Sequence, residues 1–408
     1  MIRTIARFLG VLLVVSALAV AVVAAARLET IDAEIHTGRI VSLTDERIAM
    51  QVDGQARTFP RNEVVEVVLA RAKDVMSKNG QVVLVTTAGD LLAADDLRLD
   101  AGRLSCSVGM LTQTSVPIEA IRFIYMPTVC LNARNVRSKC DEMKLTGAAA
   151  DRLVVVKDDK IGAWLNVEGV LKAIDEKNVI FRWDDKDVKV ARRIVRAICL
   201  PALQPDRADV ADFAGELVGK DGSTLAFDSV HLGTDETQFV VDSPCLGVVR
   251  ARRDRVAAIR FRSDRIMNLA DLTPAEAKQR GVFDAGFPYR INRAAGGGPL
   301  RLGGKVYRTG LGLHSFCELT YELKGRYSRF VAVVGIDDAV RPLGNATVTL
   351  LADGKALAEP IRVTGKSDAT TVRLNVAGAK LLTIRVDFGA DSLDVADHVN
   401  IVKARLIK

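Results

Sequence analysis

A chain of 408 residues is long enough for roughly two to four domains. Its apolar fraction of 49% suffices for well-packed cores, whereas an aromatic fraction of 5% leaves few rings for stacking on a ligand. The net charge of +7 is modest for this length, so composition by itself does not indicate a nucleic-acid-binding protein.

The N-terminus has the form of a secretory signal. Arg3 and Arg7 precede an apolar run over residues 8–26, which ends in three alanines before Arg27. A basic start, an apolar stretch and a small-residue cleavage point are typical of a signal peptide. The run is also long enough to be a retained membrane anchor. Because the arginines stay inside in either case, we expect an exported protein that is periplasmic, on the cell surface or secreted, with residues 1–26 as its signal or anchor.

Four weakly similar β units follow the signal. Two of them lie in residues 27–126, a third in 151–200 and a fourth in 213–262. Each has a strand, an acidic turn, a second strand, a polar break and a short apolar segment with Val or Ile three or four apart. This pattern indicates small bent barrels or sheets, similar to SH3 or Sm-like barrels. The sequence is compatible with separate barrels and with units that pair edge to edge.

Three connections separate these parts of the chain. Residues 127–150 are polar and lack strand periodicity, which predicts a linker or a short helix. Residues 201–212 contain two prolines and are expected to be a second linker. The third, residues 263–298, is expected to hold a short helix that begins at Thr273-Pro274, because Thr is a good cap and Pro suits the first helical position.

Six cysteines in an exported chain could form disulfides. Cys130 and Cys140 bracket a short polar segment and are the expected local pair. Cys106, Cys199 and Cys245 are interpreted as small buried residues within strands. No Cys-x-x-Cys or Cys/His spacing indicates zinc.

Residues 299–408 have the clearest strand pattern. Leu319, Tyr321 and Leu323 alternate with polar residues, as in a strand with one buried face. A turn at Lys324-Gly325 and a nearly all-apolar run follow, and later strands are joined by an Asp-Gly hairpin. This spacing predicts a sandwich of two antiparallel sheets, so the fold class is mainly β throughout.

Several short motifs occur here in a specific order. They are Gly310-x-Gly312-x-His314, Tyr321-x-Leu323-x-Gly325-x-Tyr327-x-x-Phe330, Val334-Gly335-Ile336-Asp337-Asp338, Asp353-Gly354-Lys355, and Asp397-His398 before Ala404-Arg405-Leu406. In order and spacing they resemble the NPCBM/NEW2 family, carbohydrate-binding β-sandwich modules often attached to bacterial glycoside hydrolases. The resemblance covers the last quarter of the chain. It implies recognition of a carbohydrate or glycoconjugate.

Polar residues in these motifs are the candidate ligands of a sugar. His314 follows two glycines, which allow a tight turn, and its ring could bond a sugar hydroxyl or pin the turn to a carbonyl. Asp337, Asp338, Asp397 and His398 lie at strand ends. They could bind sugar hydroxyls, and the first two could ligate calcium. Capping of turns is the alternative role for each.

Aromatic candidates are few. The family usually has a Trp after the Asp-His pair, where this chain has Val399-Asn400-Ile401. The remaining rings are Tyr307, Phe316, Tyr327 and Phe388, of which Phe388 is expected to face inward. Because so few rings are available for stacking on a sugar, Tyr327 is included among the candidate binding residues.

The chain's two tryptophans lie in the third unit. Trp164 and Trp183 are interpreted as buried anchors of a small barrel, with a binding platform as the alternative.

Catalysis has little support in the sequence. Glycoside hydrolysis needs two carboxylates about 5–10 Å apart, whereas Asp337 and Asp338 would point to opposite sides of a strand. No nucleophile-elbow, His-Glu-x-x-His or Walker pattern occurs. The arginines between Arg250 and Arg265 are interpreted as a solvated strand face, and export argues against nucleic acid.

We therefore expect an exported, non-catalytic carbohydrate-binding protein without a cofactor other than calcium. A structural or protein-interaction module of a cell-envelope assembly, with envelope proteins as partners, is the first alternative. A hydrolase that uses the repeated units as its body is the second.

Overall fold

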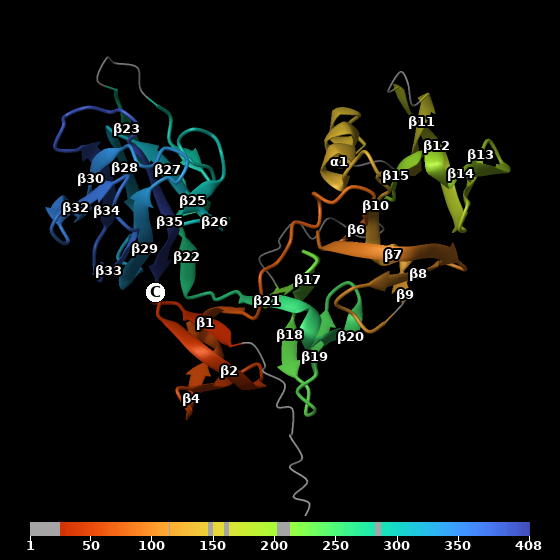
Figure 1. Ribbon diagram of the computed structural model, residues 1–408, viewed down its shortest axis with the longest axis horizontal. Coiled ribbons are helices and arrows are strands. Elements are labelled where there is room, and N and C mark those ends of the chain that lie inside the picture. Colours follow the sequence, from red (N-terminus) through yellow and green to blue (C-terminus); the bar gives the residue numbers. More distant parts are fainter. Residues whose placement is uncertain (1–24, 114, 146–149, 159–162, 202–212, 282–286) are drawn as a thin grey trace, which may run out of the picture.

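The computed structural model of the chain describes residues 25–113, 115–145, 150–158, 163–201, 213–281 and 287–408. Its described residues hold 35 strands and one α-helix, so the chain is mainly β, as the sequence predicts. In Figure 1 the C-terminal sandwich lies at upper left and the second and third units lie at upper right, with the strands of the first and fourth units below them.

The predicted signal lies outside the described residues, except at its end. Ala26, the last residue of the predicted segment, is buried and already begins the first strand. Within the part of the chain that the structure describes, no helix has the length and apolar character needed to cross a membrane.

The first and fourth units share one eight-stranded sheet, in the order β17-β16-β21-β5-β1-β2-β3-β4. The junction is the antiparallel pairing of β5 with β21, in which Val67 lies opposite Ile259. The strands are β1 (Ala26–Thr30), β2 (Ile35–Leu43), β3 (Arg47–Val52), β4 (Gln55–Pro60), β5 (Val64–Val68), β16 (Gly215–Gly219), β17 (Thr224–Phe227) and β21 (Val256–Phe261). A separate three-stranded sheet in the fourth unit contains β18 (Ser229–Leu232), β19 (Gln238–Ser243) and β20 (Gly247–Arg252).

The second and third units share a ten-stranded sheet, in the order β14-β13-β12-β11-β15-β10-β6-β7-β8-β9. Here β10 pairs with β15, and Ile124 lies opposite Ile198. The strands are β6 (Val82–Thr86), β7 (Leu91–Asp100), β8 (Arg103–Val108), β9 (Ser115–Pro117), β10 (Ile121–Tyr125), β11 (Asp151–Asp158), β12 (Ala163–Ile174), β13 (Asn178–Trp183), β14 (Lys186–Ala191) and β15 (Val195–Cys199). The units thus pair edge to edge and do not form separate barrels. The pairing does not follow chain order throughout, because the first unit pairs with the fourth and the second with the third.

One local feature recurs in all four units. A single turn of 3₁₀ helix precedes the last strand of each, at Arg61–Glu63, Ile118–Ala120, Arg192–Ile194 and Arg253–Arg255. In every case the residue after this turn returns to the extended conformation. The short apolar segment that ends each unit is therefore a strand, and these strands form the pairings between units.

The connection at residues 127–150 contains the α-helix, α1 (Ala133–Glu142), capped by the side chain of Asn132. Its buried face brings Cys140 against Cys199 of β15, with which it hydrogen-bonds. Cys130 is exposed, and all six cysteines are free. The expected Cys130–Cys140 bridge is therefore wrong, because the amphipathic helix turns Cys140 into the core and leaves Cys130 in solvent.

The tryptophans depart from the predicted role of buried anchors. Trp164 packs only partly against the core around α1. Trp183 at the end of β13 is 57% exposed. The end of the β13–β14 hairpin extends beyond the core, so among the described residues no other element covers the side chain of Trp183.

The C-terminal module is a sandwich of two antiparallel sheets. The back sheet has the order β24-β27-β35-β29-β33 with β22 beside β35, and the front sheet has the order β23-β28-β34-β30-β31 with β32 beside β30. The strands are β22 (Ile266–Asn268), β23 (Glu276–Gln279), β24 (Arg290–Ile291), β27 (Gly310–His314), β28 (Cys317–Glu322), β29 (Arg329–Ile336), β30 (Asn345–Ala352), β31 (Lys355–Ala356), β32 (Ile361–Thr364), β33 (Thr370–Asn375), β34 (Leu381–Phe388) and β35 (His398–Ile407). A small hairpin of β25 (Leu300–Leu302) and β26 (Lys305–Tyr307) lies beside the back sheet.

The sandwich begins at Ile266, so the prediction of a linker with a helix over residues 263–298 is wrong. The residues after Thr273-Pro274 form the edge strand β23, in which Lys278 lies opposite Glu318. Pairing with β28 satisfies the backbone groups of this short segment and outweighs its local helix-start signal.

The two outer faces of the sandwich differ. The first unit covers part of the back sheet: Ile31 packs with Val331 and Ile407, and Arg373 donates to the carbonyl oxygen of Asp32 (2.5 Å). The β25–β26 hairpin covers another part of it. As a result the C-terminus lies beside β1 (Figure 1). The front sheet instead carries exposed charged side chains on its outer face, and the candidate site lies there.

Candidate functional site

The Gly-x-Gly-x-His motif forms a strand, β27, in place of the expected turn. A Cβ on Gly312 would lie 2.2 Å from the carbonyl oxygen of Arg293, and one on Gly310 would lie 2.6 Å from that of Ile401. The glycines are therefore required by the close approach of neighbouring backbones. The chain turns after the strand, at Ser315 and Phe316.

His314 is 3% exposed and bonded within the module, contrary to its predicted contact with a ligand. Its Nδ1 donates to the carbonyl oxygen of Ser315 (2.8 Å), so it pins the turn. The ring stacks against Phe287 (4.0 Å between centroids) and lies edge-on to His398 (5.4 Å). Burial and the neighbouring imidazole of His314 lower the pKa of His398, which keeps it neutral at pH 7.

Asp397 is a structural residue as well. Its carboxylate accepts hydrogen bonds from the hydroxyl of Ser315 (2.6 Å) and from the backbone N–H of Asn345 (2.8 Å). The side chain is fully buried, and burial raises its pKa. It joins two loops at one end of the sandwich, and its complete burial keeps the carboxylate out of reach of a sugar.

Asp337 and Asp338 hold the β25–β26 hairpin in place. Buried Asp337 accepts from the backbone N–H groups of Arg301 (3.2 Å) and Ala339 (2.8 Å) and from the side-chain amide of Asn400. Asp338 accepts from two consecutive glycine N–H groups of the hairpin turn, at 3.0 and 2.7 Å. Among the described residues no group of three or more His, Cys, Asp or Glu side chains could hold a metal ion. The structure thus gives these carboxylates a turn-capping role, contrary to the predicted sugar or calcium ligation.

Of the aromatic candidates, Phe316 alone lines a pocket on the front sheet. Tyr327 is buried in the sandwich core, contrary to its predicted role as a binding residue. Tyr307 is partly covered beside Lys403, and Phe388 is half-buried.

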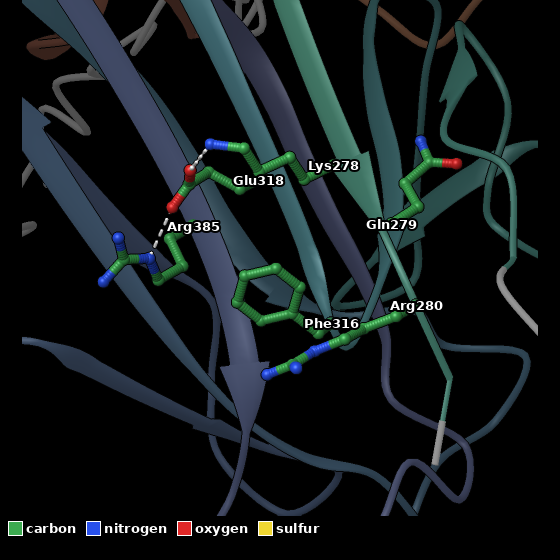
Figure 2. A pocket seen from close by; sticks show the side chains of 6 residues that line it. All are labelled: Lys278, Gln279, Arg280, Phe316, Glu318 and Arg385. Atoms are coloured by element: carbon green, nitrogen blue, oxygen red, sulfur yellow. Dashed lines mark hydrogen bonds and ion pairs between the residues drawn. The ribbon is translucent and has the colours of Figure 1, made fainter. Parts of the chain in front are cut away.

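This shallow pocket of about 410 Å³ lies on the outer face of the front sheet (Figure 2). Its lining comes from β23, β28 and β34 and from the turns that flank them, and consists of Lys278, Gln279, Arg280, Phe316, Glu318 and Arg385. The register of the sheet builds it, because Glu318 lies opposite Lys278 on one side and opposite Arg385 on the other. These three side chains therefore form one row across three strands.

Glu318 is the central charge of this row. Its carboxylate accepts from Nε of Arg385 (2.7 Å) and from Nζ of Lys278 (3.4 Å). Burial by itself raises the pKa of Glu318, but the bonds and charges of Arg385 and Lys278 outweigh it and leave the pKa below its ordinary value. Glu318 is therefore ionised at neutral pH and orients both cations.

Phe316 and Arg280 form the second part of the pocket. Their backbones exchange two hydrogen bonds, of 3.0 and 2.9 Å, which extends the pairing of β23 with β28 by one residue pair. The guanidinium of Arg280 lies over the Phe316 ring, with Cζ 4.8 Å from the ring centroid. Figure 2 shows the ring between Arg280 and the Glu318–Arg385 pair.

Part of this site can be read from the sequence. Phe316 is among the aromatic candidates, and Glu318 and Arg385 alternate with core residues. Lys278 and Arg280 are not among the predicted site residues, because their segment is predicted to be a linker with a short helix. The signal that could have found them is the alternation of Glu276, Lys278 and Arg280 with less polar residues, which fits an edge strand.

The pocket joins an aromatic ring to hydrogen-bonding charged groups, an arrangement suited to binding a polar ligand that has an apolar face. Its lining has one carboxylate, whereas glycoside hydrolysis needs two. The C-terminal part of the chain is thus a β-sandwich module with a pocket on the outer face of its front sheet. Residues 266–407 match the NPCBM/NEW2 domain, which confirms the resemblance found in the sequence for this part of the chain.

The curated relative that matches is a protein of Renibacterium salmoninarum described as a candidate endo-alpha-N-acetylgalactosaminidase. The two are 37% identical over 90 residues, which are 22% of this chain and 6% of the relative. The chain therefore corresponds to a small fraction of that protein's length.

Two solved structures are also similar. The CBM51 module of Clostridium perfringens GH95, in complex with methyl-galactose, is 23% identical, with a TM-score of 0.32 over 35% of this chain and 99% of that one. The CBM51-2 and INT domains of Clostridium perfringens ZmpB, in complex with GlcNAc, are 20% identical, with a TM-score of 0.33 over 48% and 38%.

Proposed function

We propose that residues 266–407 bind a carbohydrate or glycoconjugate in the front-sheet pocket and that the module is not catalytic. The match of these residues to the NPCBM/NEW2 domain supports the ligand class. The observation that carries the choice of site is the position of Phe316, which lies partly exposed beside a row of ordered charged side chains.

The chemistry of the pocket suits a sugar. A pyranose has C–H groups that pack on an aromatic ring, whose face is electron-rich, and hydroxyl groups around its edge that accept and donate hydrogen bonds. Phe316 supplies the ring. Glu318 can accept from hydroxyls, and Arg280, Lys278 and Arg385 can donate to them.

We further propose that the protein is exported and that it acts in the cell envelope or outside the cell. The basic and apolar character of residues 1–26 supports export. If this segment is retained, it would also be the point of membrane attachment.

The test is a comparison of two aromatic variants on a glycan array. Phe316→Ala should abolish or weaken glycan binding by about 10- to 100-fold, as expected for the loss of a stacking ring. Phe287→Ala is the matched control: this ring is 46% exposed, belongs to the same module and lies against His314. It should leave binding within about twofold of the parent chain, since it lies outside the pocket.

If Phe287→Ala loses binding and Phe316→Ala does not, the binding site lies instead beside Phe287, His314 and His398. Unchanged binding in both variants would show that neither ring takes part in glycan binding, and the proposed front-sheet site would be wrong. Circular dichroism of each variant confirms that it is folded.

A second candidate function is a structural or protein-interaction module of an envelope assembly. It is favoured by the internal bonding of His314, Asp337 and Asp397 and by the packing of the first unit on the back sheet. An array without any bound glycan, together with a stable complex recovered with an envelope protein, would support this function. The hydrolase alternative predicts release of sugar from the bound glycan, which chromatography of the products would detect.

A further inference from the structure

The front-sheet pocket is cationic. Its lining contains Lys278, Arg280 and Arg385 and only one carboxylate, Glu318, which leaves a formal charge of +2. The cations are not equivalent, however. Lys278 is shared between Glu318 (3.4 Å) and Glu276 (3.1 Å), so its charge is already matched within the sheet.

Arg385 has unused donors. Its Nε donates to the carboxylate of Glu318. Within the described residues, the Arg385 side chain forms its hydrogen bond and its ion pair with Glu318. Figure 2 shows its two terminal nitrogens directed away from Glu318. The bond to Glu318 fixes the plane of the guanidinium and presents a fork of N–H groups, the geometry that matches the oxygens of a carboxylate or sulfate.

Arg280 provides a second such group on the opposite side of Phe316. It is exposed, lies over the ring, and makes no ion pair with any carboxylate of the described residues. Stacking on the ring restricts the guanidinium, so less conformational entropy is lost when it binds a ligand.

These uncommitted groups are donors only, because a guanidinium cannot accept a hydrogen bond. Neutral hydroxyls satisfy such donors weakly, whereas anionic oxygens form charge-assisted bonds with them. The charged groups of the pocket therefore favour a ligand that carries negative charge beside its ring face.

We propose that the ligand is an acidic glycan, in which a carboxylate or sulfate group binds Arg385 or Arg280 while a sugar ring packs on Phe316. This inference rests on the proposed function and specifies its ligand class. The carboxylate of a sugar acid and a sulfate ester share the required chemistry, and the test separates them.

The experiment probes the full chain on an array that holds sialylated, uronic-acid, sulfated and neutral glycans. The acidic glycan that binds most strongly is then compared by calorimetry with the same glycan lacking its acidic group. The acidic member should bind at least about tenfold more tightly, and its affinity should fall as NaCl is raised from about 0.05 to 0.5 M. Whether sugar acids or sulfate esters dominate the array identifies the anionic group.

Variants assign the effect to the pocket. Arg385→Gln and Arg280→Gln are measured separately, and the variant that removes the arginine bound to the acidic group should reduce the preference for the acidic member by about tenfold. Arg362→Gln is the matched control, because Arg362 is an exposed arginine on β32 of the same sheet but outside the pocket. It should change the preference less than about twofold.

Equal binding of acidic and neutral members, or a preference that survives in both arginine variants, would overturn this inference. In that case loss of binding in Phe316→Ala would still uphold the proposed function. If the array binds no glycan of any class, the proposed function fails and the acidic specificity fails with it.

Discussion

Glu29 near the start of the chain and Arg405 near its end form a buried ion pair, with 3.3 Å between Oε1 and Nη2. Both residues are only 3% exposed. Lys403 contacts the other carboxylate oxygen, and Arg405 also donates to the carbonyl oxygen of Thr30 (2.9 Å). Burial lowers the pKa of Arg405, and the charge of Glu29 opposes this effect. The pair fixes the first unit on the back sheet of the sandwich.

Replacement of Glu29 by Ala should therefore be strongly destabilising. It leaves Arg405 buried without its counter-charge, which costs about 3–5 kcal/mol in the free energy of unfolding. Glu34→Ala removes an exposed glutamate from the same unit and should cost about 0–1 kcal/mol. Thermal unfolding and limited proteolysis between the unit and the sandwich measure the difference. Equal melting temperatures for the two variants would show that the buried pair does not hold the interface.

Gly312 should not tolerate a side chain. A Cβ would lie 2.2 Å from the carbonyl oxygen of Arg293, so Gly312→Ala must separate β27 from the segment beside it. We expect a loss of about 3 kcal/mol or more. Gly298→Ala is the control, because no atom lies within 4 Å of the position that its Cβ would take, and it should be nearly neutral. Chemical denaturation of both variants tests this, and a stable Gly312→Ala protein would contradict the packing.

Stability should also depend on Asp90, which is buried between the second and fourth units. It accepts from the backbone N–H of Ala226 (2.6 Å) and from the hydroxyl of Thr86 (3.0 Å), and burial raises its pKa from 3.8 to about 6. Between these values the folded state binds the proton and the unfolded state does not. Stability therefore falls as pH rises through this range, by about 3 kcal/mol in total.

Asp90→Asn removes this dependence. The difference in stability between the variant and the parent chain should therefore shift in favour of the variant as pH rises from 4 to 7.5. Thermal unfolding of both proteins at these two pH values measures the shift. The exposed Asp100 of β7 offers the control Asp100→Asn, which should show the same difference from the parent at both pH values. A constant offset for Asp90→Asn would argue against a raised pKa.

Cysteine reactivity distinguishes the structure from the predicted Cys130–Cys140 bridge. Cys130 is exposed, whereas Cys140 of α1 and Cys199 of β15 are buried together in the core between these two elements. Burial raises the pKa of Cys106 to about 11 and that of Cys317 to about 12, which disfavours their thiolates. Native-state alkylation followed by mass spectrometry should label Cys130 at least about tenfold faster than these four. Joint protection of Cys130 and Cys140 would instead support the bridge.

Local features of the sandwich could be predicted because they depend on neighbours in the sequence. Tyr321 faces the core as its alternation requires, and so do Val348 and Leu350. Lys324-Gly325 and Asp353-Gly354 form turns with positive φ, which glycine at the second position and Asp353 at the first favour. The candidate site was less accessible to this reasoning, since the prominent His314 is buried and Phe316, two residues later, lines the pocket.

The sequence by itself determined the strand-rich class, the sandwich with its family, and the core-facing side of regular strands such as β28 and β30, because side chains alternate with a period of two along a strand. The tertiary structure decided which strands of distant units pair and which outer face stays open. Val67 meets Ile259, and Ile31 covers Val331, through contacts whose register no local pattern encodes. Since the first unit occupies part of the back sheet, the front sheet is the face on which Phe316 and its neighbouring arginines line an open pocket.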